Sequence, residues 1–485
     1  MKKIIFNIAV ALGLTASLAG CKGWLNVTPY DKIAEGDLLS TDEGFKKLLN
    51  GIYIELNSDK LYGSSLTVEM IEIMGGAYVI GSDNTVWGNY KDLASYKYGT
   101  EYWRGRFSET WNTAYSLILN CNKILEKIPE KKDLFNQTEY DIIRGEAIAL
   151  RAMLHFDLLR IFGPVYSKNP EAASIPYYTR YTNTPEDILP ASQVAEKILS
   201  DLKEAKNLLS DDPVRTQGTM MGTAPDNVSP FLRYRSLRMN YYAVSALLAR
   251  ASLYLGDRVE ANKNAMEVIK AADSGIFPFV DKNLVTGSPE DPDRIFASEV
   301  IFALSHSARN TIFKNYFDQS RLPGYVFRMD NSLMDNVIYG GSQTGGSKDD
   351  YRYKACWIAT GANRYFYKYS DKVAVGSVEN TMIPMLRIGE MYLIAAETQS
   401  ANLSGGTPYI NLLRKNRGIG NISTLNENLL KYEYIRELYG EGQLFYLYKR
   451  LFSEVIVSAN PSENPQPSAE IFTVPLPDSE TDNRQ

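Results

Sequence analysis

The chain has 485 residues, enough to bury a large hydrophobic core, and its 52 Lys and Arg against 57 Asp and Glu give a net charge of −5 at pH 7. Binding to nucleic acid draws on clustered Lys and Arg, so this mildly acidic composition excludes nucleic acid as an expected partner. Two histidines and three cysteines are too few for a metal centre with several imidazole ligands or for a thiolate zinc cluster. We therefore expect no metal site and no cofactor.

The first twenty residues are typical of an export signal that ends at Cys21. Lys2 and Lys3 supply a positive start, the run to residue 19 is almost entirely apolar or small, and small residues directly precede Cys21. This run is shorter than the ~20 residues of a membrane-spanning helix, which favours cleavage. Removal of residues 1–20 leaves 50 basic against 57 acidic residues, a net charge of −7, in a mature chain 21–485 that begins at a lipidated Cys21. The alternative is a soluble secreted protein in which Cys21 is an ordinary thiol.

Paired helices are the clearest periodic signal along the rest of the chain. The first pair is predicted at Phe107 to Ile128, which Pro129 ends, and at Arg144 to Phe162, whose two apolar stripes indicate a helix packed on two sides. The aromatic and small residues of this pair are similar to the tetratricopeptide pattern of antiparallel helices. Two further pairs and one more helix are predicted at Tyr241 to Leu255 with Asp257 to Ala272, at Met385 to Ser400 with Pro408 to Arg417, and at Asn426 to Gly440.

Long stretches rich in Gly, Ser, Asn, Asp, Pro and Tyr separate these helices. Loops of such length inside a compact protein are usually functional. The stretches are 62–104, 168–190, 210–234, 277–296 and 309–381. Short β-type runs at Val300 to Leu304 and Phe366 to Tyr369 are expected to pair in small sheets.

Several polar residues on the predicted helices are expected to hold the scaffold together. They form two groups on two helix faces, namely Arg387, Glu390 and Glu397, and Arg144, Arg151 and His155. Ion pairs between helices explain both groups without any ligand. Cys121 is expected to be a buried, inert thiol. The sequence leaves open whether Cys121 and Cys356 form a disulfide.

A series of short motifs runs through the whole mature chain. The motifs are Cys21 with Trp24 to Pro29, Trp111 to Leu125, Gly145 to Ala152, Phe156 to Gly163, Ser298 to Leu304, Leu386 to Glu397, Glu441 with Gly442, Lys449 with Arg450, and Val474 to Asp478. Their order and spacing resemble the SusD/RagB family, lipoproteins that capture nutrients at the outer membrane of Bacteroidetes-type bacteria. Family members on the cell surface often carry acidic residues after the lipidated cysteine, whereas Lys22 and Gly23 follow Cys21 here. Surface exposure is therefore implied by the resemblance alone.

The resemblance implies a mainly α fold of tetratricopeptide-like helix pairs with long loops and a few short β-strands. It implies one domain over residues 21–485, with a helix-pair scaffold in 21–275 and a loop-rich ligand region followed by C-terminal helices in 276–485. It further implies a lipid-anchored outer-membrane protein that faces the exterior and passes an oligosaccharide to a SusC-like TonB-dependent transporter, docking through 111–162 and 241–272. The alternatives are a peptide-binding RagB-like lipoprotein and a structural partner of the transporter without its own ligand site.

Catalysis is not expected from this chain. No Gly-x-Ser-x-Gly elbow occurs, and Gly341 to Lys348 departs from the phosphate-binding loop because Ser347 stands where Lys is required. A glycoside hydrolase needs only two carboxylates at the correct separation, but the resemblance implies a binding protein.

The prediction of a ligand site rests on aromatic residues in the long stretches. Sugar rings have apolar C–H faces and polar edges, which suit a flat aromatic side chain flanked by amide, carboxylate or guanidinium groups. Two stretches offer that mixture, with weaker candidates elsewhere. The first is Asp83, Asn84, Trp87, Asn89 and Tyr90, the second is Tyr351, Arg352, Tyr353 and Trp357, and the weaker candidates are Tyr325, Arg364 and Tyr365. The competing interpretation is that these aromatics pack against helices, because 33 tyrosines cannot all touch a ligand.

Overall fold

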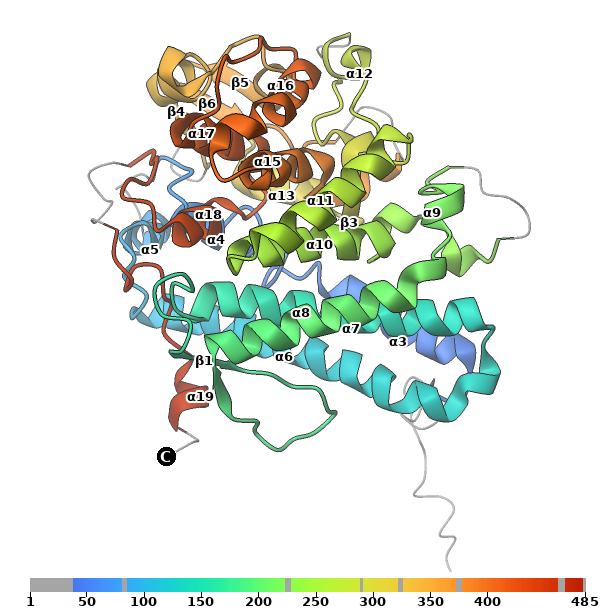
Figure 1. Cartoon of the computed structure of the whole chain (residues 1–485). Helices are drawn as coiled ribbons and strands as arrows, with labels where there is room; N and C mark the ends of the chain where they lie inside the picture. The colour runs from blue at the N-terminus through green and yellow to red at the C-terminus, as the bar shows by residue number, and fades with distance from the viewer. Residues whose placement is uncertain are drawn as a thin grey trace, which may run out of the picture.

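The computed structural model describes residues 38–80, 85–222, 228–287, 291–321, 326–371, 377–460 and 467–482. The N-terminal half contains α3 (Asp42–Glu55), α4 (Met70–Met74), α5 (Thr85–Ala94), α6 (Glu101–Lys127), α7 (Gln137–Phe162), β1 (Ala173–Pro176), β2 (Ile188–Pro190), α8 (Ala191–Leu208), α9 (Val214–Gln217), α10 (Tyr241–Tyr254) and α11 (Arg258–Asp273) (Figure 1). The C-terminal half contains α12 (Lys282–Thr286), β3 (Val300–Ser305), α13 (Asn310–Tyr316), β4 (Met329–Asp330), α14 (Tyr351–Cys356), β5 (Trp357–Thr360), β6 (Asn363–Phe366), β7 (Met382–Arg387), α15 (Ile388–Thr398), α16 (Thr407–Asn416), α17 (Glu427–Leu438), α18 (Leu444–Leu451) and α19 (Asp478–Thr481). The fold is mainly α with small sheets, as the sequence predicts.

Helix α7 lies at the centre of the N-terminal half. Almost every residue from Glu139 to Phe162 is buried, which confirms the prediction of a helix packed on two sides. Helices α6 and α8 lie along it (Figure 1). Asn136 caps the start of α7, where its side-chain oxygen accepts a hydrogen bond from the backbone N–H of Glu139 at 2.9 Å.

The other predicted helix pairs also form. Helix α10 packs against α11, and α15 packs against α11, α16 and α17. The start of α15 differs from the expected one, because Met385 to Arg387 belong to strand β7 and the helix begins only at Ile388. Strand β7 pairs antiparallel with β3, which confirms the strand predicted from Val300.

Four of the stretches expected to be loops contain short helices instead, among them α9 in 210–234 and α12 in 277–296. The stretch 62–104 includes α4 and α5, and the stretch 309–381 includes α13, α14 and a three-stranded sheet of order β4-β6-β5. Helices this short give too few turns for a clear apolar stripe, since α4 has 5 residues and α5 has 10. This difference decides where several of the predicted ligand residues lie.

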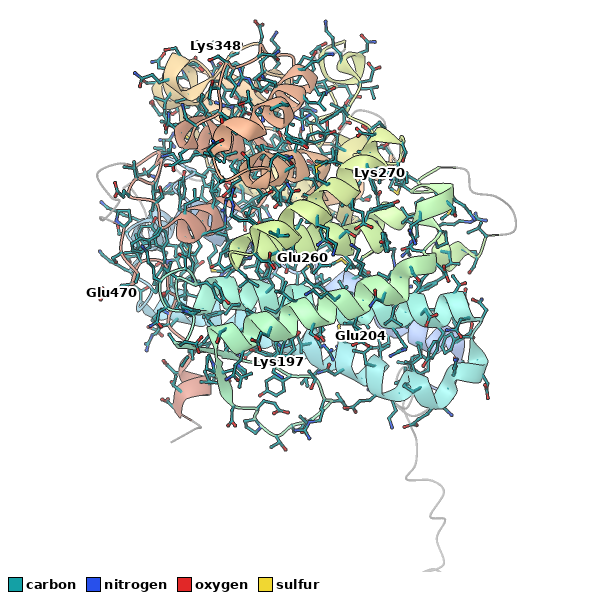
Figure 2. The ribbon with its side chains drawn as sticks, viewed as in Figure 1. Lys197, Glu204, Glu260, Lys270, Lys348 and Glu470 are labelled. Carbon is teal, nitrogen blue, oxygen red and sulfur yellow. The ribbon has the colours of Figure 1, made fainter. Side chains whose placement is uncertain are left out.

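One continuous hydrophobic core joins the two halves of the chain. It runs from Leu39 near the start of the described residues to Val474 near their end. Charged side chains cover the outer faces of the helices, as Lys197 and Glu204 on α8 show (Figure 2). Within the part of the chain that the structure describes, none of the helices combines the length and the apolar character of a membrane span.

Ion pairs join the helices as the sequence predicts. Arg151 on α7 donates two hydrogen bonds to Asp201 on α8, at 2.8 and 2.7 Å. The same kind of bond joins α10 to α15 through Arg250–Glu390 and α18 to α15 through Arg450–Glu397. These groups hold the scaffold, because both partners of each pair are buried or nearly so and saturate each other.

His155 and the two described cysteines also belong to the interior. The Nδ1–H of His155 donates to the carbonyl of Arg151 at 2.9 Å, and burial lowers the pKa of the imidazole to about 3. Cys121 and Cys356 are both free and buried, so no disulfide joins them. Burial raises the pKa of Cys121 to about 12, which confirms the inert thiol expected there.

Candidate functional site

Two segments far apart in the sequence, around Trp87 and around Phe327, come together in the structure. The ring of Trp87 on α5 lies 5.9 Å from the ring of Phe327, and the backbone N–H of Val79 donates to the carbonyl of Arg328 at 2.8 Å. Helix α5 therefore sits beside the chain that follows α13. Among the predicted site residues, Cys21, Asp83, Asn84 and Tyr325 lie outside the described residues.

Trp87 is part of the core rather than of the surface. Its side chain is 1% exposed and contacts the rings of Tyr90 and Phe327. The composition of this stretch led us to expect a loop, but α5 turns the indole inward. Trp87 therefore presents no open ring face to a ligand. Asn89 on the same helix is half-buried, and its carbonyl accepts a hydrogen bond from the indole N–H of Trp103 at 2.6 Å.

Tyr90 reaches a polar cluster at the edge of the core. Its hydroxyl donates to one carboxylate oxygen of Glu69 at 3.0 Å, while Arg106 on α6 donates to the other at 2.5 Å. Arg106 also donates to the hydroxyl of Ser65 at 2.7 Å. Burial raises the pKa of the Glu69 carboxyl, and the charge of Arg106 opposes that rise. The ion pair keeps charged hydrogen-bonding groups beside an aromatic ring.

Two further tyrosines stand next to this cluster with part of their surface open. Tyr102 is 41% exposed and meets the ring of Trp103 edge-on at 5.0 Å. Tyr316 at the end of α13 is half-buried and stacks on Phe327, with centroids 5.5 Å apart and an interplanar angle of 13°. Burial raises the pKa of both phenols, and the charge of Glu69 adds to each rise, which places both near that carboxylate.

We call Glu69, Tyr90, Tyr102, Arg106 and Tyr316 the tyrosine surface. It joins partly open aromatic rings to a guanidinium that the buried carboxylate of Glu69 holds in place, a combination that fits the faces and edges of sugar rings. Sequence reasoning found Tyr90 and missed the other four. The spacing of Tyr102 and Arg106, one helical turn apart, was an available signal, whereas the position of Tyr316 depends on the tertiary fold.

The second predicted group of ligand residues is structural. Arg352 is 4% exposed and donates to Asp350, Glu433 and Glu437 at distances of 2.6 to 3.1 Å. Trp357 is 6% exposed and packs between other aromatic rings. Both were expected at the surface of a loop, and the helix α14 and strand β5 place them inside.

The remaining predicted ligand residues near this group are also engaged in contacts within the protein. Tyr351 is half-buried against Gly418, and the hydroxyl of Tyr353 donates to Asp335 at 2.7 Å. Arg364 pairs with the same Asp335 at 2.7 Å, and Tyr365 is buried. These residues support the three-stranded sheet and the turn before α14.

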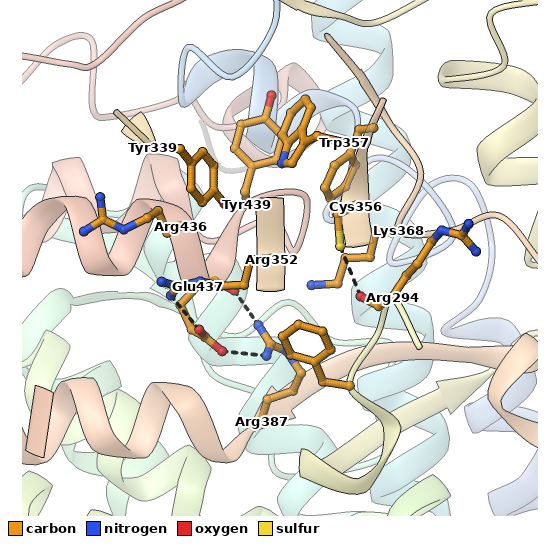
Figure 3. A pocket seen from close by; sticks show the side chains of 12 residues that line it. Arg294, Tyr339, Arg352, Cys356, Trp357, Lys368, Arg387, Arg436, Glu437 and Tyr439 are labelled. Carbon is orange, nitrogen blue, oxygen red and sulfur yellow. Dashed lines mark hydrogen bonds and ion pairs between the residues drawn. The ribbon is translucent and has the colours of Figure 1, made fainter. Parts of the chain in front are cut away.

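Figure 3 shows the cavity that this second group lines. Arg352 and Arg387 point at the carboxylate of Glu437, with hydrogen bonds of 2.9 and 2.7 Å, and Trp357 and Tyr439 close the opposite side. The cavity holds about 20 Å³, room for one or two water molecules and too little for a sugar ring. It is an internal ion-pair network.

Comparisons with known proteins agree with this fold. Residues 23–222 match a family model described as starch-binding associating with the outer membrane, and residues 307–478 match the model of the SusD family. The chain is 25% identical to the SusD-like protein P38 of Formosa agariphila, over 88% of this chain and 83% of that protein. It is also 25% identical to SusD-like protein P2 of the same organism, over 44% of this chain and 39% of that protein.

Solved structures share the architecture at low sequence identity. A SusD-like carbohydrate binding protein from Bacteroides vulgatus superposes with a TM-score of 0.68 at 20% identity, covering 91% of this chain and 96% of that one. A laminarin binding SusD-like protein superposes with a TM-score of 0.62 at 18% identity, covering 91% and 97%. These likenesses show that the fold is shared.

Proposed function

Because the chain belongs to the SusD/RagB family, we propose that it captures an oligosaccharide at the outer membrane and delivers it to a SusC-like TonB-dependent transporter. The ligand class is supported by the starch-binding family model and by the similar structures of a carbohydrate binding and a laminarin binding protein. Starch and laminarin are therefore the first glycans to test. The proposal assigns binding and no catalysis to this chain.

The observation that carries the proposal is the tyrosine surface. Partly open rings of Tyr102 and Tyr316 flank Arg106, whose side chain is 22% exposed and is held by the buried Glu69, so a sugar can stack on the rings and accept hydrogen bonds from the guanidinium. The hydroxyl of Tyr90 holds the carboxylate of Glu69 in place through a hydrogen bond. The surface is preorganised, since these contacts exist without ligand, and preorganisation limits the entropy lost on binding.

We also propose how the chain is held and where it docks. A lipid on Cys21 would tether the protein to the outer face of the outer membrane, which raises its effective concentration near the transporter without a tight interface. The helix pairs at 111–162 and 241–272 would face the transporter. The proposal of a single domain over residues 21–485, with a scaffold up to residue 275 and a ligand region after it, stays a prediction. The tyrosine surface contains residues from both of these parts.

Calorimetric titration tests the ligand class. Protein lacking residues 1–21 is titrated with malto-oligosaccharides, with laminari-oligosaccharides and with a peptide digest. We expect heat with at least one glycan series and little change with salt, because stacking and neutral hydroxyl contacts are weakly screened. Heat with the peptides alone would support a peptide-binding protein instead. The absence of binding heat with all three would favour a protein that is a structural partner of the transporter and has no ligand site of its own.

A further inference from the structure

A groove of about 310 Å³ lies between the first turns of α6 and the chain segment 474–479. Tyr98 and Phe107 are 6% and 3% exposed and form part of its floor. Arg104 and Asp478 meet across it in an ion pair of 3.2 Å, and their side chains are 56% and 66% exposed. The volume falls within the range of small-molecule sites, ~300–1,000 Å³.

This groove and the tyrosine surface lie on opposite flanks of the same turns of α6. Successive residues of an α-helix are turned by about 100° around its axis. Tyr102 and Arg106 therefore share one face of α6, while Arg104 and Ser108, which line the groove, share another nearly half a turn away. On a helix about 10–12 Å wide with its side chains, the path between the two faces measures roughly 15 Å.

One position on the helix edge between the two faces carries no side chain, with Glu101 and Glu109 one turn to either side of it. Gly105 lies there, and a Cβ added to it would meet no atom within 4 Å. Gly99, just before the helix, is equally open. A glycine inside an exposed helix weakens it by about 1 kcal/mol relative to alanine. The absence of a side chain at residue 105 leaves room for a ligand to cross the helix, and this explains why a glycine occupies that position despite its cost to helix stability.

We propose that the groove is a second saccharide subsite, which takes sugar residues of the same oligosaccharide that binds the tyrosine surface. The inference rests on the proposed function and adds the path of the ligand across Gly105. Its chemistry suits a sugar, because aromatic and proline carbons form the floor while Arg104, Ser108 and Asp478 offer hydrogen-bond donors and acceptors at the rim. The exposed ion pair can exchange its mutual contact for contacts to hydroxyl groups at little loss.

Binding should then depend on ligand length. In the wild type, affinity rises along the malto- or laminari-oligosaccharide series until the ligand spans both sites. Gly105→Leu places a side chain across the path, and leucine is a good helix former, so the fold is retained. We expect the longest oligosaccharides to lose about tenfold in affinity, while disaccharide binding to the tyrosine surface is unchanged. Asp478→Ala should flatten the same length dependence without blocking the path.

A matched control separates the path from a general effect of leucine. Gly51 on α3 is also a helical glycine whose added Cβ would meet nothing within 4 Å, and Gly51→Leu should bind every oligosaccharide like the wild type. If Gly105→Leu and Asp478→Ala both keep the wild-type length dependence, the second subsite is overturned while the proposed function stands. If no oligosaccharide binds the wild type at all, the proposed function falls and the subsite falls with it.

Discussion

Replacing Trp87 or Tyr102 by alanine separates a core residue from a residue that faces ligand. Trp87 is 1% exposed and its ring contacts Tyr90 and Phe327, so Trp87→Ala leaves a cavity of indole size. We expect the free energy of unfolding to fall by about 3–5 kcal/mol. Tyr102 is 41% exposed, and Tyr102→Ala should change that free energy by about 1 kcal/mol or less.

The affinity for oligosaccharide should fall more in Tyr102→Ala than in Trp87→Ala, the reverse of the order expected for stability. Loss of one stacking ring removes about 0.5–1.5 kcal/mol, so Tyr102→Ala should weaken oligosaccharide binding by about two- to twelvefold. Folded Trp87→Ala should lose less than Tyr102→Ala. Urea unfolding and calorimetric titration with the tightest-binding oligosaccharide measure the two effects on the same samples.

A second exposed tyrosine provides the control. Tyr181 is 45% exposed in the loop after β1, and Tyr181→Ala should alter neither stability nor affinity. The reasoning would be refuted by a Trp87→Ala variant that unfolds like the wild type yet loses the oligosaccharide, because that result would place the indole against ligand.

Further predictions concern buried charge, pH, thiols and the anchor. Glu437→Ala removes the carboxylate at the centre of a buried arginine network and should lower the free energy of unfolding by about 3–5 kcal/mol in urea titrations; unchanged stability would contradict the network's role. Burial raises the pKa of Glu72 from 4.5 to about 8, so the folded state holds a proton that the unfolded chain releases, and this group should lower stability as pH rises from 4.5 to about 8. Glu72→Gln should remove that loss, and parallel pH profiles of wild type and variant would contradict it. Cys121 and Cys356 should react with a thiol reagent only after unfolding, because burial raises their pKa to about 12 and about 11; fast labelling of the native protein would show otherwise. Cys21→Ala should release the protein from the membrane fraction with oligosaccharide binding intact, and retention in that fraction would argue against the lipid anchor.

The helix pairs could be predicted from sequence because their apolar stripes repeat over several turns. The scaffold ion pairs could be predicted for the same reason, since Arg144 and Arg151 share a face of a long helix and Glu390 and Glu397 share a face of another. Such signals are local to one segment. Their partners across the helices, such as Asp201 and Arg250, could not be named in advance.

The ligand residues could be predicted only in part, because their exposure depends on distant segments. Trp87 is buried because Phe327 packs on it, and Trp357 is buried because Tyr439 does, and no local pattern around either tryptophan shows these contacts. The short helix α5 and the strand β5 then decide which way each side chain points. Conversely, Tyr316 joins the tyrosine surface from another part of the chain, which composition alone does not show.

The crystal structure of the mature protein with a bound malto- or laminari-oligosaccharide tests the central claim most directly. Our account predicts sugar rings stacked on Tyr102 and Tyr316, with hydroxyl groups in contact with Arg106. An oligosaccharide bound at full occupancy on another face, with the tyrosine surface empty, would contradict it.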